Sequence, residues 1–186
     1  MLTLIPQSQY KIMPWKNGLG QTAQIQIFPE KAQFPDNFTW RLSSALVKAD
    51  DPFSNFEGCQ RVLTVVDGAG LILNDAKLLP GKVIYFSGED SIYCKLIDGE
   101  VLDLGVIWKP DLVSVTLSHR FVEQREVIDL SLKGVHFACV TSGVVRVGEV
   151  KVQARDTIKI EQVEQIIIEP DGLQSSVALI SIVPVL

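Results

Sequence analysis

The sequence is poor in the residues from which many functional sites are built. Only two histidines, His119 and His136, occur among 186 residues, and they have no H-x-H spacing. A transition-metal site based on histidine needs two or three such ligands close together, so we predict no metal site and no cofactor. Lys and Arg (17) are outnumbered by Asp and Glu (22), and no basic run occurs. We therefore expect no nucleic-acid partner.

Cysteine is also scarce, and long apolar stretches are missing. Cys59, Cys94 and Cys139 form no CxxC pair, and no secretory signal layout is present in the N-terminal MLTLIPQSQYK. These features favour a cytoplasmic protein with reduced thiols. The most apolar segment, 177–186, is too short to cross a bilayer as a helix. We predict a buried strand there and no membrane association.

The usual signals of nucleophilic catalysis are absent too. No G-x-S-x-G motif occurs, and the glycines of GLGQ (18–21) do not make a G-x-G-x-x-G loop. Cys59 has no histidine near it in the sequence, so we interpret it as a small buried residue. Motifs alone therefore predict no catalytic set.

What the sequence does contain is a succession of short apolar runs, alternating or broken by Gly, Pro, Asp and Asn. Helical spacing is not sustained over three turns anywhere. Short strands at this spacing predict an all-β fold, either a sandwich or a barrel. The predicted strands span 22–29, 38–47, 61–68, 70–74, 82–88, 91–97, 100–108, 112–128 in two pieces, 135–143, 144–152, 156–160, 164–170 and 177–183.

An internal repeat indicates two copies of one unit. Residues 62–86 align without a gap with residues 137–161, and the alignment pairs Gly68 with Gly143. Such self-similarity is typical of duplication. Because Pro110 is poorly suited to a continuing central strand, we place the boundary near it. The predicted domains are 1–108, which carries the candidate pocket, and 109–186, a degenerate copy with a mainly structural role.

Arginines occur inside two strands that otherwise have a buried pattern. In the strand 38–47, a period of two places Arg41 on the face opposite Trp40, whereas Arg61 shares a face with Leu63 and Val65. An arginine in apolar surroundings needs an anion, so each pairs either with an acidic residue of the protein or with a ligand. The alternative is that both side chains point outward into water.

Two loops flank these strands. MPWKNGLGQT, residues 13–22, suits a tight turn because its glycines and asparagine accept positive φ, but it equally suits the rim of a site. The loop 50–61 contains Phe53 and Phe56. It predicts either the wall of a cavity or a loop held on the barrel end by its own phenyl rings.

These segments resemble motifs of the HutD/Ves family: an M-P-W-K-N-G-G-G opening, an F-x-W-R-x-S-x-A strand and a G-P-F-S-x-F-P-G-x-x-R loop. The matching stretches are MPWKNGLGQT, FTWRLSSALVKADDPFSNFEGCQR and YFSGEDSIYCKLIDG, in that order, all in the N-terminal part of the chain. The resemblance implies a bicupin, two cupin-like barrels without the histidine metal set. It further implies a bacterial cytoplasmic protein linked to histidine utilisation or, in the Ves branch, to stress response.

Transferred residue by residue, the resemblance implies a binding pocket in the N-terminal domain. Its cationic side chains would hold the carboxylates of a small planar or dicarboxylic anion, and its aromatic rings would bury the remainder. Urocanate and N-formylglutamate, intermediates of histidine breakdown, fit this description. The implied pocket residues are Trp15, Lys16, Asn17, Gln24, Trp40, Arg41, Ser43, Phe53, Ser54, Arg61, Phe86, Gly88 and Asp103.

Several positions depart from the family pattern. Leu19 displaces the third glycine of the opening motif, Gln24 replaces a glutamate, Asp51 a glycine and Glu57 a proline, and residues 103–110 have the unusual sequence DLGVIWKP. These changes bear on the identity of the ligand and on the shape of the pocket.

Three functions stay open at this point. The first is a binding protein that limits or tunes flux through histidine breakdown. The second is an isomerase or hydrolase, in which Asp103 would be the acid or base, because a glutamine at position 24 cannot ionise. The third is an interaction protein whose C-terminal unit serves as a structural part or as a homodimer surface.

Overall fold

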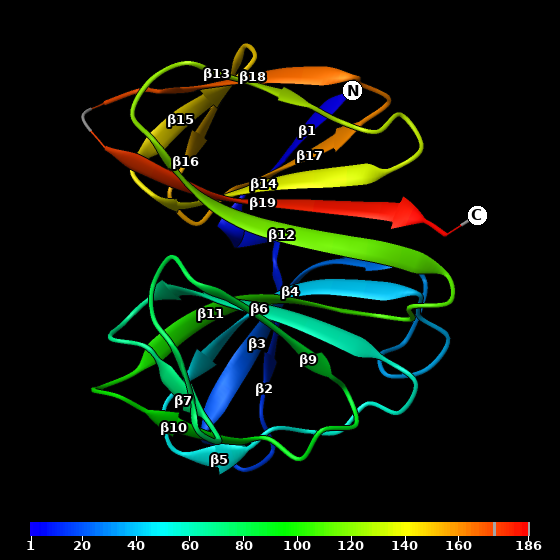
Figure 1. Ribbon diagram of the computed structural model, residues 1–186, viewed down its shortest axis with the longest axis vertical. Helices are drawn as coiled ribbons and strands as arrows, with labels where there is room; N and C mark the ends of the chain where they lie inside the picture. Colours follow the sequence, from blue (N-terminus) through cyan, green and yellow to red (C-terminus); the bar gives the residue numbers. More distant parts are fainter. Residues whose placement is uncertain (173, 186) are drawn as a thin grey trace. The chain divides into compact units, whose positions relative to one another are not determined.

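The computed structural model describes residues 1–172 and 174–185, which form β-strands joined by turns and one short 3-10 helix, η1 (Gln7–Gln9) (Figure 1). The all-β prediction is confirmed. The chain divides into two compact units. We call Tyr10–Val113 the N-unit, and Met1–Gln9 together with Ser114–Leu186 the C-unit. Among the described residues, no helix has the length and apolar character needed to cross a membrane.

The N-unit is a pair of antiparallel sheets with a shared core. Apolar residues of both sheets, among them Val65, Leu71 and Cys94, pack together. The six-stranded sheet has the order β2-β3-β4-β11-β6-β9 and the four-stranded sheet the order β5-β10-β7-β8. The strands are β2 (Lys11–Pro14), β3 (Gly20–Phe28), β4 (Trp40–Val47), β5 (Asp51–Pro52), β6 (Gln60–Asp67), β7 (Leu71–Leu73), β8 (Ala76–Leu78), β9 (Val83–Ser87), β10 (Tyr93–Leu96) and β11 (Val101–Trp108).

The C-unit has the same construction. Its five-stranded sheet has the order β1-β17-β14-β19-β12, and its four-stranded sheet the order β13-β18-β15-β16. Between them lies a core rich in valine and isoleucine, including Val145, Ile158 and Ile168. The strands are β1 (Leu2–Ile5), β12 (Val113–Val122), β13 (Glu126–Asp129), β14 (Val135–Ser142), β15 (Val144–Val147), β16 (Val150–Gln153), β17 (Thr157–Glu161), β18 (Gln165–Pro170) and β19 (Ser175–Pro184).

The unit boundaries differ from the expected division at residue 108 in two respects: the N-unit extends to Val113, and it begins at Tyr10. Met1–Gln9 belong to the C-unit, because β1 pairs antiparallel with β17 over Leu2–Ile5. This pairing joins segments from opposite ends of the chain, and neither segment carries a local pattern that identifies its partner.

The predicted strands are confirmed, with corrections. The region 112–128 is two strands, as expected, whereas 144–152 is a hairpin that turns at Gly148, where φ is +57°. Four short strands, β1, β2, β5 and β8, were not predicted, and all four lie at sheet edges. An edge strand pairs on one side and buries little, so its sequence shows weak alternation. β19 confirms the buried C-terminal strand, although Leu186, also in the predicted segment, lies outside the described residues.

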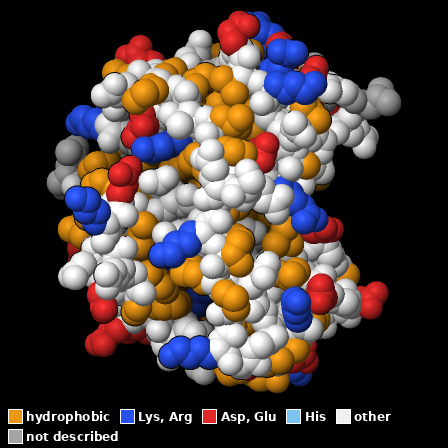
Figure 2. Space-filling model, turned by 180° about the vertical axis from the view of Figure 1, so that it is seen from behind, with side chains coloured by type: hydrophobic (Ala, Val, Ile, Leu, Met, Phe, Trp, Pro, Cys, Tyr) orange, Lys and Arg blue, Asp and Glu red, His pale blue; other side chains and the backbone are white. Residues whose placement is uncertain are grey.

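The surface carries charges of both signs. On the face shown in Figure 2, Lys and Arg side chains are interspersed with Asp and Glu. The ion pairs are exposed or half-exposed; the shortest joins Lys151 Nζ to Asp171 Oδ2 at 2.6 Å. Such pairs contribute little to stability. Each unit is therefore stabilised mainly by the packing of its own hydrophobic core.

Candidate functional site

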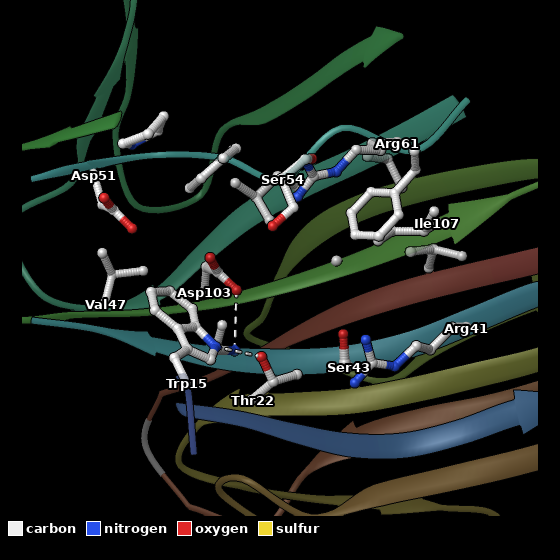
Figure 3. A pocket seen from close by; sticks show the side chains of 18 of the residues that line it. Trp15, Thr22, Arg41, Ser43, Val47, Asp51, Ser54, Arg61, Asp103 and Ile107 are labelled. Atoms are coloured by element: carbon white, nitrogen blue, oxygen red, sulfur yellow. Dashed lines mark hydrogen bonds between the residues drawn. The ribbon is translucent and has the colours of Figure 1, made fainter. Parts of the chain in front are cut away.

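The N-unit contains a cavity of about 510 Å³ (Figure 3). Its floor is formed by β4, β11 and β6, and its walls by the turn between β2 and β3 and by the segment from Asp51 to Phe56. Nine of the predicted pocket residues line it: Trp15, Lys16, Asn17, Arg41, Ser43, Phe53, Ser54, Arg61 and Asp103.

The register of three strands places the two arginines. β11 lies between β4 and β6, and Ile107 pairs with Arg41 on one side and with Arg61 on the other. Residues paired across a sheet project from the same face. Both arginines line the cavity, so the alternative in which they point outward into water does not hold for this structure.

The guanidinium of Arg41 contacts Gln24 and the ring of Phe34. Arg41 is 6% exposed; its Nε donates a hydrogen bond to Gln24 Oε1 at 3.0 Å, and its Cζ lies 4.2 Å from the centroid of the Phe34 ring. Burial lowers the pKa of Arg41 to about 10, so the group stays cationic at neutral pH. Within the described part of the chain, Arg41 forms an ion pair with no acidic side chain.

Arg61 is held by aromatic rings. Its Nη1 donates to the carbonyl oxygen of Ser54 at 3.2 Å, and burial lowers its pKa to about 10. No carboxylate of residues 1–172 or 174–185 forms an ion pair with it. Cation–π contacts of this kind orient a guanidinium without neutralising it. The ring centroids lie 5.0 Å (Phe53), 5.4 Å (Phe56) and 4.9 Å (Phe86) from its Cζ.

Asp103 contributes a buried carboxyl group to the same floor. The residue is 5% exposed, and its Oδ1 accepts a hydrogen bond from the backbone N–H of Ala45 at 3.0 Å. Burial raises the pKa of Asp103 to about 7, against the opposing effects of the Ala45 hydrogen bond and of the Arg61 charge. A carboxyl group with this pKa exchanges a proton near neutral pH, so it can act as an acid, a base or a pH-dependent acceptor.

Residues 13–22 form a tight turn and also part of the rim of the cavity. The backbone N–H of Trp15 donates to the carbonyl oxygen of Gly20 at 3.0 Å, closing the hairpin between β2 and β3. The indole Nε1 of Trp15 donates to Thr22 Oγ1 at 2.9 Å inside the cavity. Asn17 Nδ2 donates to Asp51 Oδ2 at 2.8 Å. Asp51, one of the departures from the family pattern, thus ties the turn to the opposite wall.

Four of the predicted residues do not line the cavity: Gln24, Trp40, Phe86 and Gly88. Gln24 lies behind Arg41, which it orients through the hydrogen bond described above. Phe86 lies behind Arg61, against the core between the sheets. Trp40 is buried at 5% exposure, and the alternation along β4 directs it to the face opposite the cavity. The period of two in the sequence already separates Trp40 from Arg41.

Two glycines shape the site. Gly88 lies against the aromatic loop, where a Cβ atom would collide with the carbonyl oxygen of Phe56. Gly105 lies in the cavity floor, where a Cβ atom would lie 2.7 Å from the carbonyl oxygen of Val62 and 2.9 Å from Leu63 Cδ1. We did not predict Gly105 as a site residue, although an isolated glycine within a strand is a known signal of close approach.

Thr22, Phe34 and Ile107 are further residues that the sequence did not single out. Thr22 and Ile107 line the cavity, and Phe34 covers the guanidinium of Arg41. No local motif distinguishes them, because each acquires its place through a partner on another strand or loop.

His136 and Cys59 lie in structural surroundings, whereas Nδ1 of His119 is buried without a hydrogen-bond partner among the described residues. His136 Nδ1 lies 2.8 Å from Ser181 Oγ and its Nε2 lies 2.9 Å from the carbonyl oxygen of Ser131, so both ring nitrogens have partners. Cys59 is 4% exposed, as predicted, and burial raises the pKa of its thiol. In the described ranges, no three His, Cys, Asp or Glu side chains gather closely enough to form a group that could hold a metal ion.

Comparisons with known proteins agree with the N-terminal motifs. A family model described as HutD matches residues 7–178. An "uncharacterized 21.2 kDa protein in hutC 3'region" of Pseudomonas putida is 40% identical over 114 residues, which are 59% of this chain and 59% of that protein. The match therefore spans less than two thirds of the curated relative.

Solved structures match over the whole chain. The conserved protein of unknown function PA5104 from Pseudomonas aeruginosa PAO1 has a TM-score of 0.88 and 26% identity, with 98% of this chain and 99% of that chain covered. HutD from Pseudomonas fluorescens SBW25, in a formate condition, has a TM-score of 0.84 and 26% identity, with 100% of both chains covered. YhhW from Escherichia coli, at 13% identity, a TM-score of 0.70 and 100% and 99% coverage, shares the fold alone. These neighbours are bicupins, and the predicted bicupin fold is confirmed.

Proposed function

The chain belongs to the HutD family, and from this premise we propose that its N-unit binds a small carboxylate metabolite of histidine breakdown and so tunes or limits flux through that pathway. The family is associated with histidine utilisation genes. The curated relative carries that association in its name, which places it in the hutC 3' region. The side chains that line the cavity indicate which chemical group the ligand would carry.

The observation that carries the proposal is a pair of guanidinium groups without carboxylate partners in one cavity. Arg41 and Arg61 flank Ile107 and line a space of about 510 Å³. Removing a charged group from water is costly unless an anion compensates it. A ligand carboxylate between the two would provide that anion, and a guanidinium binds a carboxylate through two parallel hydrogen bonds.

Urocanate and N-formylglutamate are the candidate ligands. Each carries a carboxylate for the arginines and a remainder small enough for a cavity of about 510 Å³. The structure of HutD from P. fluorescens was obtained in a formate condition, which makes formate a minimal carboxylate probe for this chain as well.

Calorimetric titration tests the proposal. The wild-type protein is titrated with urocanate, N-formylglutamate and histidine, and at least one should bind. Arg61→Ala should weaken that binding by about 10- to 100-fold, because a hydrogen bond to a charged group contributes about 1.5–3 kcal/mol. Arg120→Ala is the matched control, because Arg120 pairs with Glu126 in the C-unit at 3.2 Å and should leave affinity unchanged. Absence of heat with all three compounds contradicts the proposal.

A second candidate function is an isomerase or hydrolase, favoured by the pKa of Asp103 near 7. A group with that pKa is suited to general acid–base catalysis at neutral pH. The purified protein is incubated with each pathway intermediate, and product is followed by chromatography. Turnover that Asp103→Asn abolishes would support an enzyme; unchanged substrate in every reaction would leave binding as the function.

The remaining expectations are part of the same proposal. The proposed partner is a metabolite rather than nucleic acid or membrane, and the proposed compartment is the cytoplasm. A homodimer is a separate proposal. Light scattering of the purified chain gives its mass directly and distinguishes 20.6 kDa from twice that value.

A further inference from the structure

The cavity floor has two chemically different ends. On β11, Ile107 lies between the arginines, whereas Asp103 pairs with Ala45 and Val65. These two positions are on the same face of β11, and their Cα atoms are about 13 Å apart at the rise of a β-strand. In Figure 3, Arg41 lies toward one side of the cavity and Asp103 toward the other, near Trp15 and Thr22, while the side chain of Arg61 extends toward Ser54 between them.

The floor between the two ends is open. Gly105 occupies the middle position on β11, paired with Ser43 and Leu63. Because glycine has no side chain, a ligand can lie across the sheet surface at this point. The arginine and aspartate side chains project into the cavity and shorten the span, and the charge of Arg61 already influences Asp103 across it. One small molecule can therefore reach both ends.

Asp103 offers a hydrogen-bond acceptor at its end. Oδ1 is occupied by the backbone N–H of Ala45. For Oδ2, no hydrogen-bond partner exists among residues 1–172 and 174–185. Its surroundings in the cavity include the indole of Trp15 and the side chain of Val47. An ionised carboxylate oxygen only accepts hydrogen bonds, and in apolar surroundings it is costly to leave it without a donor.

We infer that Asp103 is a specificity-determining residue that selects, among small carboxylates, those bearing an N–H donor at the end remote from the carboxylate. The inference rests on the proposed function, because it takes the arginine end as the carboxylate subsite. The ligand's N–H donates to Asp103 Oδ2 while its carboxylate lies between Arg41 and Arg61.

The same geometry disfavours dicarboxylates, so of the two candidate ligands it favours urocanate over N-formylglutamate. A second ligand carboxylate at the far end would face the carboxylate of Asp103, and one of the two would have to take up a proton. A neutral N–H group requires no such protonation. Burial raises the pKa of Asp103 to about 7 although the Ala45 hydrogen bond and the Arg61 charge act against it, so the protein compensates the charge of this carboxylate only in part.

A matched pair of probes tests the inference. 3-(Pyrrol-2-yl)propionate and 3-(furan-2-yl)propionate have nearly the same shape and charge, but only the first has a ring N–H, and neither ring titrates near pH 7. Calorimetry with the wild-type protein at pH 8, where Asp103 is mostly ionised, should show pyrrole binding at least about tenfold tighter than furan binding.

Asp103→Asn sharpens the test. The Ala45 N–H needs an acceptor, so it orients the asparagine with Oδ1 toward the backbone and Nδ2 into the cavity. The variant therefore presents a donor where the wild type presents an acceptor. The tenfold preference for pyrrole should vanish or reverse, and glutarate, a dicarboxylate, should bind more tightly than it binds the wild type.

The outcomes separate this inference from the proposed function. Equal affinity of the wild type for both probes, lost in Arg61→Ala, overturns the donor selection and leaves carboxylate binding intact. A pyrrole preference that persists unchanged in Asp103→Asn also overturns it. If the wild type binds neither probe, no formate and none of the pathway acids, both the inference and the proposed function are wrong.

Discussion

The two units share one strand order but differ in what fills them. The strands β4-β11-β6-β9 of the N-unit correspond to β12-β19-β14-β17 of the C-unit, and β5-β10-β7-β8 correspond to β13-β18-β15-β16. The N-unit holds a cavity of about 510 Å³, whereas the C-unit has one of about 190 Å³. Part of the difference is topological, because β2, β3 and the turn between them, which forms a wall of the N-unit cavity, have no counterpart beside β12 in the described part of the C-unit.

The correspondence extends to single residues. In the gap-free repeat, Val65 aligns with Val140, and each strand has an irregular register beside this residue: β6 skips Val66 against β11, and β14 skips Thr141 against β19. A shared irregularity at the same place supports duplication more strongly than the sequence similarity does.

Two positions on the corresponding strands β11 and β19 also contribute to the difference. Val65 pairs with Asp103, and the equivalent Val140 pairs with Val177. By the same alignment, Leu179 takes the place of Gly105. Val177 is fully buried in the C-unit core, and Leu179 packs against that core. Valine and leucine therefore occupy the positions in the C-unit that aspartate and glycine hold in the N-unit cavity floor.

The largest effect on stability is expected when a carboxylate is placed in the C-unit at the position equivalent to Asp103. Val177→Asp should lower the free energy of unfolding by about 3–5 kcal/mol at pH 8, because a charge without a partner is buried in a packed core. Urea unfolding followed by circular dichroism measures it. Val177→Thr, of similar shape but uncharged, is the control and should lose less. A loss below about 1 kcal/mol for Val177→Asp would show that the two interiors are interchangeable.

A smaller effect of opposite sign is expected in the open unit. Burial raises the pKa of Asp103 from 3.8 to about 7, so the folded state holds the proton more tightly than the unfolded state. The contribution of Asp103 to stability is therefore fully present below pH 4 and is lost as the pH rises through 7. Asp103→Asn keeps the Ala45 hydrogen bond without this ionisation, and should be more stable than wild type by about 2–3 kcal/mol at pH 8.

Thermal melts between pH 4 and pH 9 check this pH dependence. The advantage of Asp103→Asn should shrink toward zero near pH 4. Arg61 faces the carboxyl group from β6. Burial, together with the smaller effect of the Asp103 charge, raises the pKa of the Cys94 thiol on β10 to about 12. Parallel curves for the two proteins would mean that Asp103 titrates as an ordinary exposed carboxyl group.

An intermediate effect is expected from closing the floor. Gly105→Ala places a methyl group 2.7 Å from the Val62 carbonyl oxygen, so the backbone must shift, at a cost of about 1–2 kcal/mol. The carboxylate probes should also bind more weakly, because the floor is raised. Gly134→Ala in the C-unit, where a Cβ atom would lie 2.9 Å from the Ile182 carbonyl oxygen, imposes a similar clash away from the cavity and serves as control. Unchanged binding in Gly105→Ala would place the ligand away from β11.

The smallest effect is expected at the rim. Asp51→Gly removes the hydrogen bond to Asn17 and restores the residue type of the family pattern. Because this bond is exposed, stability should fall by less than about 1 kcal/mol and affinity by about two- to threefold. Asp51→Asn keeps an acceptor oxygen and should behave like wild type. A large loss in Asp51→Gly would mean that the rim turn, rather than the floor, determines binding.

Several parts of the site could be predicted because they have a local signature. Trp15, Lys16 and Asn17 lie in a motif, and Arg41 and Ser43 share the polar face of a strand whose period of two is visible in the sequence. Phe86 and Trp40 were assigned to the pocket from the motif alone, and they lie behind the pocket or on the opposite face. A sequence motif identifies residues by their order along the chain. It does not show which of them contact the cavity.

The sequence by itself determined an all-β chain in two similar halves, because apolar alternation, turn residues and the repeat are all local properties. Only the tertiary structure decided that Arg41 and Arg61 stand on either side of Ile107, with Asp103 further along the same strand. The physical reason is that sheet register is set by hydrogen bonds between strands far apart in the sequence. A cavity exists only once those strands are aligned.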